Sequence, residues 1–219
     1  MEETELQNEL ASIRSIMERS SKFISLSGLS GILAGVYALI GAGIAYKLMD
    51  DLNQSEGLTI NGYRQMSQLE HRRFSIDYST LVIQLLIIAT LILIASVITA
   101  IILSKRQAKK KGQSMWGAVS RQLMFHMAVP LITGGILILI LLLHGHYGIV
   151  SAVSLIFYGL ALFGSGTFTF GEVKYLGICE IILGLIAACL PGHGLLFWAL
   201  GFGVLHIIYG ARIYFKYDK

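Results

Sequence analysis

The stretch Leu81–Leu103, LVIQLLIIATLILIASVITAIIL, decides the class of this protein. It holds no charged residue, and Gln84 is its only strongly polar side chain. A transmembrane helix needs about 20 apolar residues to cross a bilayer core about 30 Å thick. Lipid cannot satisfy exposed backbone groups, and the stretch lacks the alternation of a barrel strand. It therefore predicts a membrane-spanning helix.

Similar apolar stretches fill most of the chain, which is 55% hydrophobic and 14% charged and has a mean hydropathy of +0.70. A soluble domain carries about 25% charged residues. The sequence predicts an all-α, polytopic membrane protein: a cytoplasmic segment, 1–22, followed by a six-helix bundle, 23–219. The predicted spans are Ile24–Tyr46, Leu81–Leu103, Leu123–Leu143, Gly148–Gly164, Tyr175–Leu190 and Gly194–Tyr214.

The positions of Lys and Arg predict the orientation in the membrane. Of the 17 basic residues, all but Lys47, Arg64, Arg72 and Arg73 fall in the two terminal segments, the loop Ser104–Gln122 or the turn that holds Lys174. Because basic residues favour the cytoplasmic side, both termini are expected inside (N-in/C-in), in a cell's inner, cytoplasmic membrane. The segment Lys47–Thr80 is then expected to be an outer loop.

Two segments suggest packing partners besides the lipid bilayer. Leu6, Leu10, Ile13 and Met17 have the spacing of an amphipathic helix, which either lies on the cytoplasmic interface or pairs with a cytoplasmic partner or a second copy. In the first span, Ser27, Gly31 and Gly35 form a stripe of small residues that lets another helix approach closely. That helix belongs either to the same chain or to a homo-oligomer.

The last four spans are predicted to form two similar helical hairpins. Gly148 corresponds to Gly194 and Gly164 to Gly210, with a constant offset of 46 residues. The two tight turns, His144–Tyr147 and Pro191–His193, correspond as well. This pattern indicates a duplicated hairpin in the C-terminal part of the bundle.

The second hairpin, Tyr175–Gly210, reads YLGICEIILGLIAACLPGHGLLFWALGFGVLHIIYG. It resembles the HdeD-type acid-resistance membrane proteins, which are built from short apolar hairpins with a Pro-Gly turn. The residues that carry the resemblance are Gly184, Pro191, Gly192, Gly194 and Gly210. The resemblance implies a six-span, stress-related protein with no catalytic residues.

Glu180 is the only carboxylate inside any predicted span, and an ionisable group at that depth usually has a partner or a task. Gly177 and Gly184 flank it, so it should point into the bundle. His206 on the last span and His126 on the third lie in the same inner half. The sequence predicts an intramembrane polar site of Glu180, His206 and His126, which either fixes helix register or responds to protons.

Other histidines suggest cofactor alternatives, although no cofactor is the leading expectation. His144, His146 and His193 lie in the two outer turns and could bind zinc or copper, or be solvated turn residues. His126 and His206 could ligate a haem.

No sequence feature indicates catalysis: there is no GxSxG motif, no Ser/His/Asp cluster at one depth and no paired carboxylates for lipid hydrolysis. Nucleic acid is not an expected partner, because the basic residues collect at membrane edges. The leading hypothesis is a non-enzymatic structural or stress-response membrane protein with a pH-sensitive Glu/His site. The alternatives are a small proton- or cation-coupled transporter or channel, or a metal- or haem-binding membrane protein.

Overall fold

All regular secondary structure in the described part of the chain is helical. The computed structural model describes residues 27–56, 68–110, 112 and 117–219, with the backbone alone for 53–56 and 68–78, and these ranges contain no strand. The predicted segment 1–22 lies outside the described residues. The long helices are α2 (Gly28–Glu56), α4 (Gln68–Lys110), α5 (Ala118–Leu143), α6 (Val150–Ser165, preceded by the short η1, Tyr147–Ile149) and α7 (Gly171–Cys189).

The chain ends in one further helix, Gly194–Asp218, here called the C-terminal helix. It runs through four segments: α8 (Gly194–Trp198), the π-helical η2 (Ala199–Leu205), α9 (His206–Ile213) and the π-helical η3 (Tyr214–Asp218).

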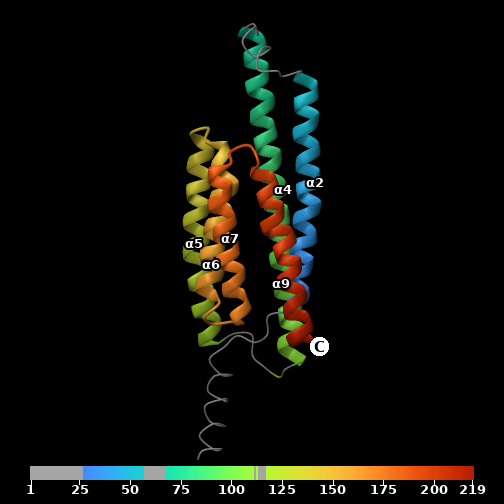
Figure 1. The fold of residues 1–219 in the computed structure, drawn as a ribbon, viewed down its shortest axis with the longest axis vertical. Coiled ribbons are helices and arrows are strands. Elements are labelled where there is room, and N and C mark those ends of the chain that lie inside the picture. The colour runs from blue at the N-terminus through green and yellow to red at the C-terminus, as the bar shows by residue number, and fades with distance from the viewer. Residues whose placement is uncertain (1–26, 57–67, 111, 113–116) are drawn as a thin grey trace, which may run out of the picture.

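The helices form two groups, visible side by side in Figure 1. In one group α6 packs against both α5 and α7, and in the other α2 packs against both α4 and the C-terminal helix. The C-terminal helix also contacts α6 and α7. It therefore joins the two groups, and any side chain on its inner face lies at the boundary between them.

Five helical stretches are long and apolar enough to cross a membrane: Gly28–Leu52, Ser79–Lys110, Ala118–Leu143, Tyr147–Ser165 and Gly194–Asp218. The prediction of an all-α protein is confirmed for the described residues, and these five helices are candidates for membrane spans. The helix α7 is not among the five, and it carries Glu172, Lys174 and Glu180.

The prediction that Lys47–Thr80 forms a loop is wrong for most of this segment, which is helical. The helix α2 continues to Glu56, and α4 already begins at Gln68. Hydropathy marks where lipid contact ends, whereas backbone hydrogen bonding continues in water wherever the residues tolerate a helix. For the same reason α4 runs on to Lys110.

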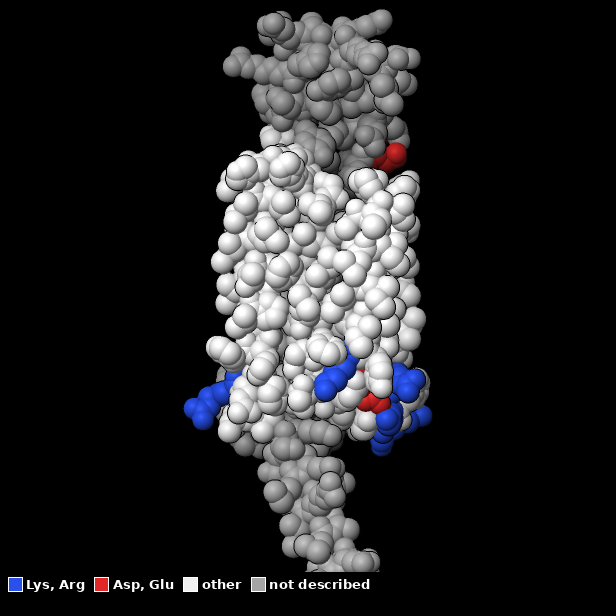
Figure 2. Space-filling view, turned by 60° about the vertical axis from the view of Figure 1, so that its left-hand side comes forward, with Lys and Arg blue, Asp and Glu red and all other residues white. Residues whose placement is uncertain are grey.

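The charges lie at the ends of an apolar belt. Figure 2 shows Lys and Arg gathered at one end of the belt, the end where α4 finishes and α5 begins. Among the described side chains Lys47 is the only Lys or Arg towards the opposite end. This asymmetry is the one on which the predicted orientation depends.

Glycines bring α2 and the C-terminal helix into backbone contact. A Cβ atom on Gly35 would lie 2.6 Å from the Gly203 carbonyl oxygen, and one on Gly31 would lie 3.1 Å from the Cα atom of Gly210. The predicted stripe Ser27, Gly31 and Gly35 is thus used within the chain. Of the two alternatives for the approaching helix, these contacts show the one within the same chain, the C-terminal helix.

Asp218 ties three helices together at the basic end. Its Oδ2 atom accepts hydrogen bonds from the Ser27 hydroxyl, at 3.1 Å, and from the Gly28 backbone N–H, at 2.8 Å. Its Oδ1 atom accepts one from Gln107 of α4, at 3.0 Å. A carboxylate at a helix N-terminus satisfies unpaired N–H groups and opposes the helix dipole, so Asp218 fixes the start of α2.

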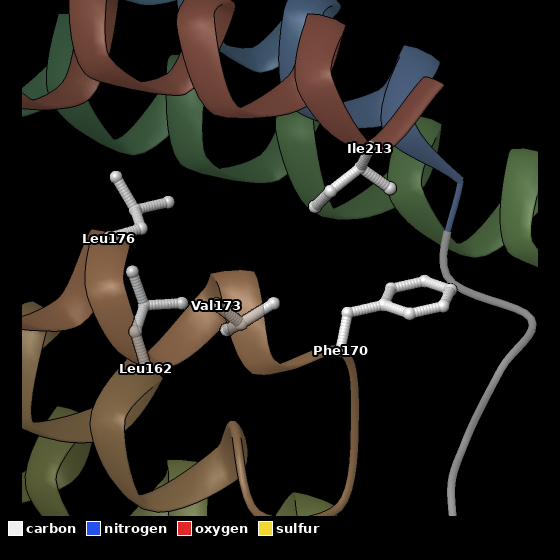
Figure 3. Close-up of a cluster of buried hydrophobic side chains, with 5 residues drawn as sticks. All are labelled: Leu162, Phe170, Val173, Leu176 and Ile213. Carbon is white, nitrogen blue, oxygen red and sulfur yellow. The ribbon is translucent and has the colours of Figure 1, made fainter. Parts of the chain in front are cut away.

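A cluster of buried apolar side chains joins the C-terminal helix to the other group near the same end. Figure 3 shows Ile213 facing α6 and α7 across this cluster. Its members are Leu162, Phe170, Val173, Leu176 and Ile213.

We predict that Gly35→Ala destabilises the protein and that Gly43→Ala on the same helix does not. The new methyl group at residue 35 would meet backbone atoms of Gly203 and Ile207, which cannot move cheaply. The expected cost is about 1–3 kcal/mol. Nothing lies within 4 Å of a Cβ atom on Gly43, so that variant should stay within about 0.5 kcal/mol of the parent. Thermal unfolding in detergent measures both, and equal midpoints would contradict this packing.

Candidate functional site

Glu180 lies in the middle of α7 and is fully buried, with 0% of its surface exposed. It is nine residues from either end of the helix, which places it about 13 Å from both. The helix α7 begins at Gly171, four residues before the predicted span start at Tyr175. Gly177 and Gly184, which flank it, pack directly against α6.

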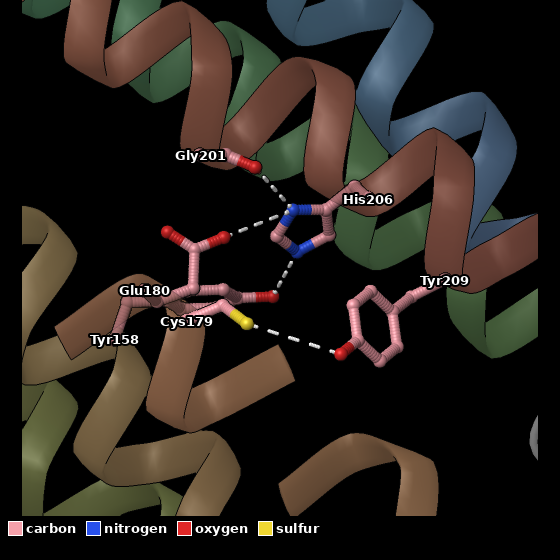
Figure 4. Close-up of polar contacts among 6 residues, drawn as sticks. All are labelled: Tyr158, Cys179, Glu180, Gly201, His206 and Tyr209. Atoms are coloured by element: carbon pink, nitrogen blue, oxygen red, sulfur yellow. Dashed lines mark hydrogen bonds and ion pairs between the residues drawn. The ribbon is translucent and has the colours of Figure 1, made fainter. Parts of the chain in front are cut away.

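His206 faces Glu180 from the C-terminal helix, as Figure 4 shows. Its Nδ1 atom lies 3.4 Å from Glu180 Oε1 and 3.0 Å from the Gly201 carbonyl oxygen. Its Nε2 atom lies 2.7 Å from the Tyr158 hydroxyl. Three helices, α6, α7 and α9, thus contribute one polar side chain each to a site at the boundary of the two groups.

The hydrogen-bond partners restrict the protonation of this site. A carbonyl oxygen only accepts, so Nδ1 of His206 carries a hydrogen and donates it to Gly201. Neither Glu180 oxygen has a hydrogen-bond partner in the described part of the chain. A buried, isolated carboxylate is very unfavourable, so the pair is stable when it carries no net charge. One proton achieves this: it makes either a neutral acid with a neutral imidazole or a carboxylate with an imidazolium.

Gly201 provides the space for the Glu180 carboxylate. A Cβ atom at residue 201 would lie 2.5 Å from Glu180 Oε2. Gly201 belongs to the π-helical segment η2, and such wider turns are frequent at functional sites. Any larger residue at this position would push the carboxylate away from His206.

Aromatic rings connect the site to a cavity at the opposite end from the basic residues. The Phe202 ring centroid lies 4.9 Å from that of Tyr158 and 6.0 Å from that of His206. The Trp198 ring follows, 5.1 Å from Phe202, and lines a cavity of about 350 Å³. Residues of both helix groups line this cavity, and nearly all are apolar.

A second buried acid, Glu172, lies at the start of α7. Its Oε1 atom accepts a hydrogen bond from Lys216, at 2.6 Å, and another from the Tyr217 hydroxyl, at 3.2 Å. Burial raises the pKa of Glu172, but these hydrogen bonds and the charge of Lys216 outweigh burial and lower it below the usual value. Glu172 therefore stays ionised and attaches α7 to the end of the C-terminal helix.

The structure brings together two of the three predicted site residues, Glu180 and His206. His126 is exposed on α5, and its ring packs on Phe168, with centroids 4.9 Å apart. It is not part of the Glu180 site, and neither is it opposite His206, both of whose ring nitrogens have other partners. The two histidines were predicted to share the inner half of the bundle, but their rings have different neighbours.

The outer histidines do not converge. His144, His146 and His193 are all exposed, and Nδ1 of His144 lies 2.8 Å from the Ile140 carbonyl oxygen of its own helix. Within the described residues no three His, Cys, Asp or Glu side chains gather in a way that could hold a metal ion. The predicted zinc or copper set is therefore not assembled.

Tyr158 and Gly201 are the site residues that sequence reasoning missed. Tyr158 lies next to Gly159, where the Gly177 carbonyl oxygen would be only 2.6 Å from an added Cβ atom. A tyrosine beside such a contact glycine was the available signal.

Comparison of the chain with known protein families, curated proteins and solved structures finds no match.

We predict that Tyr158→Phe lowers the free energy of unfolding by about 1–3 kcal/mol, because it removes the partner of a buried imidazole nitrogen. The matched control is Tyr46→Phe, in which the lost hydroxyl belongs to a side chain that is 66% exposed. Chemical or thermal unfolding in detergent gives the difference. Equal stability of the two variants would show that the Tyr158–His206 hydrogen bond contributes nothing.

We also predict that Glu172 makes stability depend on acidic pH. Its folded pKa is lowered, so its contribution is complete above the usual glutamate value of about 4.3. It is lost as pH falls from there through the folded value. Unfolding midpoints measured against pH should drop less steeply in acid for Glu172→Gln than for the parent. The control is Asp51→Asn. Asp51 is exposed in the C-terminal part of α2, far along the chain from Glu172, and this variant should show the same dependence of the unfolding midpoint on pH as the parent.

Proposed function

We propose that this chain is a non-enzymatic, six-span, N-in/C-in protein of a cytoplasmic membrane, in which protonation of the Glu180–His206 pair controls how tightly the two helix groups pack. A role in the response to acid or another stress fits this behaviour. The resemblance to HdeD-type proteins agrees with it and stays a prediction.

The length and placement of α7 support the six-span count. Its 19 residues make a helix about 28 Å long, close to the thickness of a bilayer core. It lies alongside α6 in Figure 1. Its charged residues Glu172 and Lys174 are at the basic end, and its one central charge, Glu180, faces the protein interior.

One observation carries the functional proposal: the Glu180 carboxyl group is completely buried, without a hydrogen-bond partner in the described chain, and 3.4 Å from an imidazole on the other helix group. A contact that merely fixes helix register would be expected to satisfy its hydrogen bonds. A group whose partner is a single titratable side chain changes its net charge with pH.

Counting charges gives the expected pH response. With one proton the pair is neutral, and the two groups pack tightly. A second proton in acid gives a buried charge of +1, and loss of the proton in alkali gives −1. Either charge is unfavourable in a low-dielectric interior, so the boundary should loosen at both extremes.

We predict that two variants each remove one half of this response. Glu180→Gln cannot become negative, so it should lose the alkaline transition and keep the acid one. His206→Gln cannot become positive, so it should lose the acid transition and keep the alkaline one. Trp198 is a suitable reporter, because its ring contacts Phe202, whose ring in turn lies against that of His206. Its fluorescence should be followed against pH with Trp116 replaced by Phe.

His144→Gln is the control, because this histidine is exposed in the turn after α5 and does not contact the Glu180–His206 pair. It should leave both transitions unchanged. If Trp198 fluorescence follows the same pH profile in the parent, in Glu180→Gln and in His206→Gln, the proposal is wrong.

A proton-coupled transporter is the second candidate, and the cavity of about 350 Å³ favours it. Ligand pockets start at about 300 Å³ and are mostly apolar, and this one is linked to His206 through Trp198 and Phe202. Transporter sites also lie between helix groups, beside helices whose regular winding is interrupted. Proton uptake by protein-containing liposomes that depends on an apolar solute would distinguish this function from a sensor.

A further inference from the structure

A second cavity, of about 510 Å³, lies at the basic end of the molecule. It is formed by the first turn of α7 and the last turns of the C-terminal helix, and it is separate from the Glu180 site. Arg212, Lys216 and three tyrosines contribute to its lining.

The hydrogen-bonding groups of this cavity are mainly donors. Glu172 is the only acid in the lining, and its two oxygens already accept from Lys216 and Tyr217. Arg212 is exposed and makes no hydrogen bond or ion pair with any described residue. The Tyr175 side chain is 65% exposed. An acceptor-rich anion is the ligand that such an excess of donors would bind.

The start of α7 adds to this preference. Phe170 occupies the N-cap position and supplies no side-chain hydrogen bond. The first N–H groups of a helix lack partners within the helix. At the start of α7, Val173 donates to the Phe170 carbonyl oxygen, at 3.0 Å, and the Glu172 N–H to its own carboxylate. The N–H of Gly171 remains, and Gly171 lines the cavity, where the helix dipole favours negative charge.

We propose that this cavity binds a phosphate group, presented by the headgroup of an anionic phospholipid. The planar guanidinium of an arginine matches two phosphate oxygens at once. The cavity lies where the apolar belt gives way to the basic residues (Figure 2), which is the level of lipid headgroups. Basic pockets between membrane helices bind acidic headgroups in this way.

The test compares the binding of phosphatidylglycerol and phosphatidylcholine to the purified full chain by native mass spectrometry. The parent should prefer phosphatidylglycerol. Arg212→Gln should weaken its binding about tenfold, the effect of losing one charged hydrogen bond, and Arg212→Lys should weaken it less. Arg121→Gln removes the same charge from an exposed position at the same end, outside the cavity, and should bind as the parent does.

Three outcomes decide the proposal. Equal losses in Arg212→Gln and Arg121→Gln would overturn it, because they would indicate general attraction to a basic surface. The absence of any preference for phosphatidylglycerol would overturn it too. Saturable stabilisation by inorganic phosphate alone, abolished in Arg212→Gln, would support the phosphate site and overturn the lipid as its source. Should Arg212→Gln unfold in phosphatidylcholine, Tyr175→Phe replaces it, with an expected loss of about threefold.

Discussion

The packing of this protein depends on one constraint: a carboxyl group buried in the middle of an apolar helix, α7, must have its charge compensated. Glu180 is fully buried, and desolvation makes an isolated charge there prohibitive. The compensating group is His206, on a helix of the other group. This contact brings the C-terminal helix close to α7, and the space for it comes from the missing side chain of Gly201.

The C-terminal helix holds the two groups together by different means along its length. At the basic end Asp218 binds it to α2 and α4, while Lys216 and Tyr217 bind it to Glu172 of α7. In the middle the polar contacts are the His206–Glu180 pair, the hydrogen bond to Tyr158 and the contact between Tyr209 and Cys179 of α7, at 3.9 Å. Towards the other end an apolar cavity lies between the groups. The boundary therefore carries most of its polar contacts at the basic end, whereas towards the cavity Phe197 of α8 packs against apolar side chains of α6 and α7.

The sequence was sufficient for the features that depend on one helix at a time. Apolar length predicted the membrane helices, and the contrast between Glu180 and its surroundings predicted a buried polar site. The sequence did not predict the features that depend on which helices are neighbours. His126 was predicted to lie in the same inner half as His206. It belongs to α5, and in Figure 1 α6 and α7 lie between α5 and the C-terminal helix. The partner of the Ser27, Gly31 and Gly35 stripe and the role of Tyr158 were likewise decided by which helices are adjacent.

The pH sensor and the transporter are related descriptions of one equilibrium. Trp198 lines the cavity, and its ring leads through Phe202 to the imidazole of His206. If charge at the site moves the helix groups apart, it also changes the shape of the cavity that both groups line. By thermodynamic linkage an occupant of that cavity must then change the proton affinity of the site by the same free energy. What separates the two functions is access: transport needs water to reach Glu180 from both sides in turn, whereas a sensor needs only that its proton can exchange.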